Sequence, residues 1–243
     1  MNIAQDELGA FAFHGAQAFI SVPATTLPCG ITVPAFRVAR YLSTRGRRGR
    51  VAVRADAAPW VNISYHNALR ACARSGLTLL TELQALAIAH DLCKQAVNWS
   101  GGAVGAGRVF QGLHKGRSCG VQPACVVPFD PEERRWLQLS NGERIVDFAG
   151  NAFSWVFDDV QGRPDGLVAH AFLPGTPTLA TASGRPMEQG LGWWPAVGRE
   201  WRGQALARGG AFSSGEGCGV FLVVDEHPRA ERAYIGFRCV LPG

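Results

Sequence analysis

Helical periodicity in this chain is clearest between residues 64 and 97, where two amphipathic segments follow one another. In the first segment apolar residues recur at helical spacing: Tyr65, Ala68, Leu69, Cys72 and Ala73. Ser64 is suited to cap the start of this helix, and Gly76 stands where a left-handed residue ends one. The spacing therefore predicts a helix between these two residues.

A second helix is predicted to start at Thr81, because Gln84 stands three residues later and completes a capping box. One face of this helix is predicted to hold Leu83, Leu86, Ala87, His90, Cys93 and Val97. His90 lies among apolar residues on that face. It is interpreted as a core histidine rather than a ligand.

Outside these helices the chain consists of short apolar runs separated by proline and glycine. The 30 glycines among 243 residues follow no Gly-X-Y period, which excludes collagen and indicates many turns. With 47% hydrophobic and 18% charged residues the chain is not disordered as a whole, and no apolar run is long enough to span a membrane. We predict one α+β domain over residues 1–243, with a short N-terminal strand region over residues 1–30.

The net charge of +5 and the seven cysteines add two exclusions. The densest basic run, residues 45–50, has no flanking aromatic residues for base stacking, so it is interpreted as a solvated loop. A nucleic-acid partner is therefore not expected. The cysteines show no Cys-X-X-Cys motif and no zinc spacing with histidine, so buried reduced thiols are expected.

Other candidate chemistry is sparse, and no catalytic or metal-binding residue is predicted. The glycine-rich stretch 101–107 lacks the Lys-Ser/Thr of a phosphate-binding loop. The acid pairs Glu132/Glu133 and Asp158/Asp159 are each adjacent in sequence and are predicted to be solvated. The six histidines lack the i, i+4 spacing of a helical metal pair.

Several segments in fixed order carry a resemblance to a known family. They are residues 59–84, beginning Pro-Trp-Val-Asn-Ile-Ser-Tyr-His-Asn, residues 141–158, containing Asp-Phe-Ala-Gly-Asn-Ala-Phe-Ser-Trp, residues 208–212, Arg-Gly-Gly-Ala-Phe, and residues 234–239, Tyr-Ile-Gly-Phe-Arg-Cys. Together they resemble the formylglycine-generating enzyme (sulfatase-modifying factor) family over roughly residues 30–240. The resemblance implies that family's variant of the C-type-lectin-like fold, loop-rich with short strands and two helices.

The residues themselves support this interpretation. Gly209 and Gly210 allow two backbones to approach closely, and residues 150–151, Gly-Asn, supply a turn before an aromatic strand. Arg238 lies among apolar residues and needs a buried carboxylate or carbonyl partner. The resemblance further implies that the thiols of Cys72 and Cys239 are adjacent.

The chain departs from the enzymes of this family at their copper site, which uses two cysteines shortly after the Gly-Gly pair. Aligned from Gly-Gly, the first of these falls on Ser214 and the second on Gly219, next to Cys218. A cuprous ion needs two thiolates, so copper and the oxidase chemistry are not expected. Ser154 replaces a glutamate of the family, so no cofactor is predicted, with calcium left as a weaker alternative.

A second branch of the same fold matches in more places, namely the variable proteins of diversity-generating retroelements, including phage-borne members. The matching segments are residues 98–102, 139–143, 155–159, 190–193 and 217–221. In that branch, adenine-directed mutagenesis rewrites selected codons near the 3′ end, and the scaffold displays the resulting side chains. The resemblance implies a non-catalytic ligand-binding protein, with a formylglycine-generating-enzyme-like oxidase or pseudo-enzyme as the alternative.

The predicted variable, ligand-binding region spans about residues 190–240, where scaffold motifs alternate with stretches of no evident structural role. The candidate residues are Trp193, Trp194, Glu200, Trp201, Phe212, Ser213, Ser214, Glu216, Val224, Glu226, His227, Arg229, Glu231, Arg232 and Tyr234. Aromatic residues among serines and acids are typical of adaptable binding surfaces. We expect a protein or cell-surface ligand and no membrane insertion, while the oligomeric state is left open. The first ten residues show no signal peptide, which predicts a cytoplasmic or phage-particle location.

Overall fold

The computed structural model of the protein describes residues 18–182 and 187–243. Short strands, three α-helices and long loops make up the described chain, which confirms the predicted α+β, loop-rich class. Of the predicted N-terminal strand region, residues 1–17 lie outside the described residues, and two strands occur in the remainder.

One four-stranded sheet brings the two ends of the described chain together. Its order is β1 (Phe19–Val22), β4 (Phe36–Ala39), β14 (Cys239–Leu241) and β7 (Thr78–Leu79), and all neighbours are antiparallel. The last strand of the protein therefore lies inside this sheet, between strands from the first third of the chain.

The second four-stranded sheet carries the C-terminal motifs. Its order is β12 (Val223–Glu226), β11 (Ala205–Arg208), β10 (Phe153–Val156) and β13 (Ile235–Phe237). The pair β10–β13 is parallel and the other pairs are antiparallel. Because β13 leads almost directly into β14, this segment of the chain joins the two sheets.

The remaining regular elements are short. Three two-stranded sheets are formed by β2 (Thr25–Thr26) with β3 (Thr32–Val33), β5 (Thr44–Arg45) with β6 (Val51–Ala52), and β8 (Trp136–Gln138) with β9 (Arg144–Val146). Single 3-10 turns occur at η1 (Arg47–Gly49), η2 (Ala96–Asn98), η3 (Met187–Gln189) and η4 (Gly215–Gly217). The basic run at residues 45–50 is the exposed end of the β5–β6 hairpin, as the sequence predicted.

The two predicted helices are α1 (Tyr65–Arg74) and α2 (Glu82–Cys93). The Ser64 side chain caps α1, and Thr81 and Gln84 form the predicted capping box of α2. Gly76 follows α1 with a φ of +70°, which a residue without a Cβ adopts most readily. Both predicted ends of α1 and the predicted start of α2 are confirmed, whereas α2 ends at Cys93, before Val97.

The predicted apolar faces need correction. Ala73 of α1 is exposed, and Val97 lies beyond α2 with 41% of its surface exposed. Helix α2 has no solvent-facing stripe, because nearly all of its residues are buried, polar Glu82 and His90 included. The interpretation of His90 as a core residue is confirmed.

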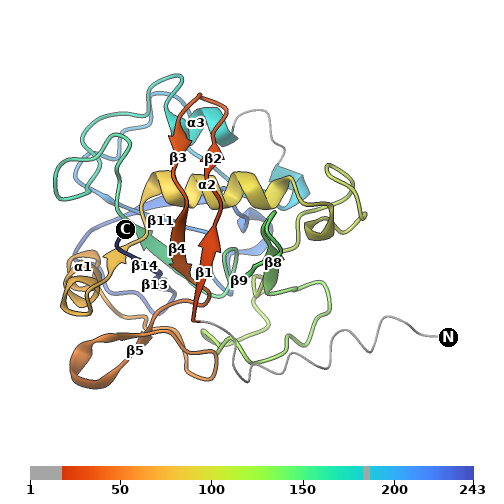
Figure 1. The fold of residues 1–243 in the computed structure, drawn as a ribbon, viewed down its shortest axis with the longest axis horizontal. Helices are drawn as coiled ribbons and strands as arrows, with labels where there is room; N and C mark the ends of the chain where they lie inside the picture. Colours follow the sequence, from red (N-terminus) through yellow and green to blue (C-terminus); the bar gives the residue numbers. More distant parts are fainter. Residues whose placement is uncertain (1–17, 183–186) are drawn as a thin grey trace.

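Helix α2 is the centre of the larger apolar core. Figure 1 shows it running across the strands β1 to β4, and its apolar residues contribute to the larger core. A second apolar cluster joins α1 to β10 and β13. A third helix, α3 (Pro177–Ala182), packs near α2 and was not predicted, because its six residues are too few for a periodic pattern. Within residues 18–182 and 187–243, no helix is long and apolar enough to cross a bilayer.

Candidate functional site

The predicted variable residues are mostly on the surface of the protein. Exposed side chains belong to Trp193, Glu200, Ser213, Glu216, His227, Arg229, Glu231, Arg232 and Tyr234. Half-buried ones belong to Trp194, Phe212, Ser214, Val224 and Glu226. The scaffold segments between them, residues 205–211, 218–223 and 235–240, are buried throughout. The C-terminal region thus alternates between core segments and exposed segments.

Trp201 is the exception, and its assignment to the binding surface is wrong. Only 3% of its surface is exposed, and its ring packs edge-on against Phe172 at a centroid distance of 5.1 Å. Trp193 lies on its solvent side, with the two ring centroids 6.2 Å apart. One tryptophan of this pair therefore belongs to the core and the other to the surface, which the sequence pattern alone does not distinguish.

Apart from Glu200, the exposed candidates fall into three neighbourhoods. Residues 212–216 lie against the loop that contains His114, since Gly215 N donates to His114 O at 2.8 Å. Residues 226–234 connect β12 to β13 and contact the start of α1, since Asn62 N donates to Arg232 O at 2.9 Å. The tryptophans at 193 and 194 flank β12 through a hydrogen bond from Val223 N to Trp193 O.

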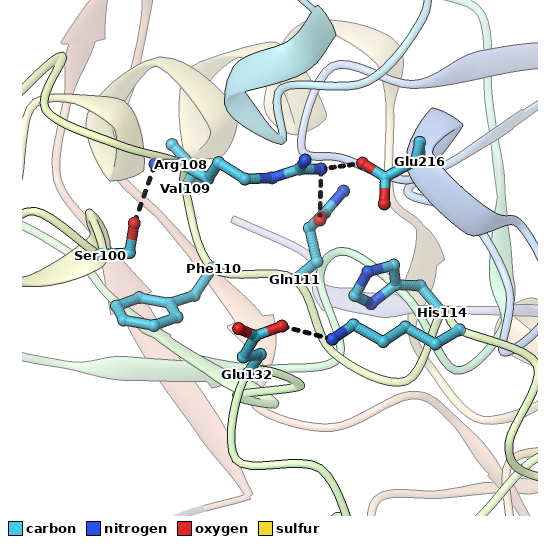
Figure 2. A pocket seen from close by; sticks show the side chains of 9 residues that line it. Ser100, Arg108, Val109, Phe110, Gln111, His114, Glu132 and Glu216 are labelled. Carbon is cyan, nitrogen blue, oxygen red and sulfur yellow. Dashed lines mark hydrogen bonds and ion pairs between the residues drawn. The ribbon is translucent and has the colours of Figure 1, made fainter.

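The first neighbourhood borders a cavity of about 200 Å³. It is lined by Ser100, Arg108, Val109, Phe110, Gln111, His114, Lys115, Glu132 and Glu216. Figure 2 shows Glu216 and Arg108 on one side of this cavity and the ring of Phe110 on the opposite side. Only Glu216 among these residues belongs to the predicted site.

The cations of the cavity are paired with carboxylates, of which Glu216 and Glu132 are exposed and Asp130 is largely buried. Arg108 Nη2 lies 2.5 Å from Glu216 Oε2 and also donates to Gln111 Oε1 at 3.3 Å. Lys115 Nζ lies 2.5 Å from Glu132 Oε2 and 2.8 Å from Asp130 Oδ2. The hydrogen bond to Asp130, followed by the one to Glu132, raises the pKa of Lys115, so the ammonium stays charged.

His114 occupies the inner part of the cavity with 3% of its surface exposed. Its Nδ1 lies 2.7 Å from Gly112 O. A carbonyl oxygen only accepts hydrogen bonds, so Nδ1 carries a proton and donates to it. Among the described residues no hydrogen bond reaches the other ring nitrogen, Nε2.

Buried charged groups hold the loop that lines the cavity, residues 108–115, and the segments around it in place. Glu133 is 3% exposed, and its Oε1 accepts from His114 N and Lys115 N, both at 2.8 Å. Arg135 forms a buried two-pronged ion pair with Asp147, at 2.8 and 2.5 Å. Residue Asn151 adds a further hydrogen bond to the same carboxylate at 2.9 Å. A loop without regular structure is thus fixed by charge-assisted hydrogen bonds.

The prediction that both acid pairs are solvated is wrong for one member of each. Glu133 is buried while Glu132 is exposed, and Asp158 is 1% exposed while Asp159 faces solvent. Asp158 Oδ1 accepts from two backbone amides, but Oδ2 has no partner among the described residues. Burial, followed by the nearby charge of Glu82, raises the pKa of Asp158 to about 6.

The residues that align with the copper site of the formylglycine-generating enzymes make structural hydrogen bonds in this protein. Cys218 is fully buried, its Sγ–H donates to Gly209 O at 3.2 Å, and burial raises its pKa. Ser214 Oγ accepts from Ala211 N at 2.8 Å, within a turn. Within the described part of the chain, no three His, Cys, Asp or Glu side chains are grouped to hold a metal ion.

Cys72 and Cys239 are both buried in the cluster that joins α1 to the second sheet, and both are free thiols. Burial raises the pKa of Cys72, and the charge of Cys239 adds to this effect. Arg238 has the predicted buried partners: its guanidinium donates to the carbonyl oxygens of Ala39, Val146 and Asp147. Its structural role is confirmed.

Sequence reasoning missed the fixed residues of the cavity: Arg108, Gln111, His114 and Lys115. Four polar or charged side chains within eight residues of a loop were the only signal available. Which of them face one cavity depends on contacts with Glu133 and with residue 216, which are far away in sequence.

No protein-family model and no curated protein matches this chain. Solved structures do show similarity. The variable protein 1 of Treponema denticola is 13% identical, with a TM-score of 0.47 over 92% of this chain and 93% of that one. PvdO from Pseudomonas aeruginosa is 14% identical, with a TM-score of 0.45 over 91% and 93%. The P3c variant of the Major Tropism Determinant is 13% identical, with a TM-score of 0.44 over 84% of this chain and 50% of that one.

Proposed function

We propose that this protein binds a ligand without catalysis, as the variable protein of a diversity-generating retroelement. The observation that carries the proposal is the alternation of buried and exposed segments after residue 190. The buried segments hold the fold together, so side chains between them can change without loss of the core. This is the property that a diversified binding surface requires.

The chemistry of Cys218 argues against the alternative, a copper-dependent oxidase. The thiol is fully buried and bonded to Gly209 O, and burial raises its pKa, which disfavours the thiolate that binds metal. At the first copper position stands Ser214, whose hydroxyl is occupied in a turn. One buried thiol cannot supply the two thiolates that a cuprous ion needs.

The ligand we propose is a protein or another cell-surface molecule. The exposed candidates are spread over three neighbourhoods, a layout that suits a large partner better than a small molecule. Exposed aromatic residues such as Trp193 and Tyr234 are suitable anchors for such a partner. The corresponding location is the cytoplasm during assembly or the surface of a phage particle.

The decisive test is the DNA next to the gene. We expect a reverse transcriptase and a template repeat that differs from the last ~150 bases only at adenines, a length taken from the size of the exposed C-terminal region. The differences should fall on codons of exposed residues such as Ser213, Glu216 and Arg229. Differences at the codons of Gly209, Phe237 or Arg238 would contradict the division into scaffold and site.

A second experiment tests the oxidase alternative directly. The purified protein is titrated with cuprous ion and incubated with a cysteine-containing peptide, followed by mass spectrometry of the peptide. We expect neither stoichiometric copper binding nor turnover. Turnover that is lost in Cys218→Ser would establish the alternative instead.

A further inference from the structure

The cavity under Glu216 has a charge arrangement that points to a specific ligand group. Its cation Arg108 comes from a loop outside the predicted variable region, whereas its carboxylate Glu216 comes from inside it. A fixed cation is therefore neutralised by a residue that the proposed diversification can replace. The inference that follows rests on the proposed function and deepens it.

Glu216 is held only loosely. Its side chain is 72% exposed and that of Arg108 is 40% exposed. Ion pairs between exposed side chains are weak because water competes for both charges. A carboxylate of comparable geometry arriving from a partner can therefore displace Glu216 from the guanidinium, which binds carboxylates in a planar, two-pronged manner.

Two other groups make the cavity suited to an acidic side chain. Lys115 contributes a second cation, which is shared between Glu132, 79% exposed, and Asp130, 11% exposed. His114 is buried, and its Nε2 has no hydrogen-bond partner within the described residues, which leaves this nitrogen available to a polar group of the ligand. The volume of about 200 Å³ admits a group of the size of one side chain.

We propose that this cavity binds an acidic side chain of a protein ligand, with Arg108 as the fixed anchor. In the absence of that side chain, Glu216 pairs with Arg108 and so acts as an internal competitor of the ligand. The residue at position 216 then sets specificity: an acidic residue weakens the binding of an anion, and a small neutral residue opens the cavity to it. Diversification of one codon would switch this preference while the anchor stays constant.

The test uses the full chain and a blocked glutamate, N-acetyl-glutamate N-methylamide, with the matching glutamine compound as the uncharged probe. Binding is followed by NMR titration. Loss of the internal competitor in Glu216→Ala should strengthen glutamate binding by up to about fivefold, the upper end of what breaking one exposed ion pair gives. The affinity for the glutamine probe should not increase.

Asp56→Ala is the matched control, because it removes one negative charge from an exposed ion pair outside the predicted variable region, the pair with Arg54 at 2.7 Å. It should leave glutamate binding unchanged. In the Glu216→Ala background, Arg108→Gln should abolish the gain. An equal gain in Asp56→Ala, or a gain that survives Arg108→Gln, would overturn the proposal.

This experiment and the test of the proposed function fail independently. Glutamate binding by the purified chain does not depend on how its gene varies. A gene without a template repeat would remove the diversification and leave the cavity as a carboxylate site. Conversely, a repeat that includes codon 216 would support the variable protein even where the glutamate probe does not bind.

Discussion

Glu82, the first residue of α2, and Arg208, the last residue of β11, form a fully buried ion pair across 126 positions of sequence. Arg208 Nε donates to Glu82 Oε2 at 2.5 Å, and its Nη2 donates to Oε1. Thr178 of α3 donates to the same carboxylate at 2.7 Å. This one carboxylate connects the central helix, the second sheet and the short helix α3.

Removing one partner of this pair should destabilise the protein strongly. Arg208→Leu leaves Glu82 buried without its counter-charge, and we expect the free energy of unfolding to fall by about 3–5 kcal/mol. Urea denaturation measures this. Arg163→Leu, which breaks an exposed pair with Asp165, is the control and should change little. The double variant Glu82→Met, Arg208→Leu should recover part of the loss. If it does not, the cost of burying an unpaired charge is not the cause.

Asp158 should make stability depend on pH between about 4 and 6. The folded state keeps the proton up to a pKa of about 6, while the unfolded state releases it near pH 4. In this window the folded state binds more protons, so the contribution of Asp158 to stability decreases as the pH rises. Denaturant titrations of Asp158→Asn and the parent chain should therefore diverge in favour of the variant, by up to about 3 kcal/mol at pH 7.

The opposite sign is expected for Glu226, whose pKa is lowered by its hydrogen bond to Arg232. Its contribution to stability is present above the ordinary carboxyl pKa and is lost as the pH falls. Relative to the parent chain, Glu226→Gln should therefore be less stable at pH 7, and this difference should shrink at pH 4. The same sign for both variants would show that the Asp158 effect is not a property of that carboxyl.

Gly209 should not tolerate a side chain. Its φ is +95°, and an added Cβ would lie 2.5 Å from Phe148 O. We expect Gly209→Ala to cost about 1–3 kcal/mol from the backbone conformation alone, with the clash added. Gly217, with no atom within 4 Å of an added Cβ, is the matched control. Thermal unfolding of the two alanine variants compares them, and equal midpoints would contradict the close approach.

The tryptophan pair separates stability from binding. Trp201→Ala should lower the free energy of unfolding by about 3–5 kcal/mol, because it empties a core position next to Phe172. Trp193→Ala, with 42% of the parent side chain exposed, should lose much less. Denaturant titration of both variants checks this, and a larger loss in Trp193→Ala would reverse the assignment of core and surface.

Thiol reactivity tests the burial of the cysteines. In the native protein an aromatic disulfide reagent should react rapidly with the exposed Cys119 and Cys125. Cys218 and Cys72 should react only after unfolding, since both are buried and burial raises their pKa. Peptide mapping of the labelled sites identifies them. Rapid native labelling of Cys218 would reopen the question of a reactive thiol.

Local sequence determined the elements whose signals are local. The capping residues Ser64 and Thr81 and the glycine at position 76 set the helix boundaries, because a cap is a contact within four residues. The glycine pair at 209–210 likewise predicted that two backbone segments approach closely. The α+β class followed from such features, whereas the alternation of scaffold and exposed segments near the C-terminus was predicted from the resemblance to a known family.

Tertiary structure decided what depends on distant contacts. The burial of Trp201 beneath Trp193, the burial of Glu133 and Asp158 beside exposed neighbours, and the cavity between Arg108 and Glu216 join segments far apart in the chain. Adjacent residues of one type look equivalent in sequence. Which of them meets solvent is set by the partner that the fold brings against it, and that partner is encoded elsewhere.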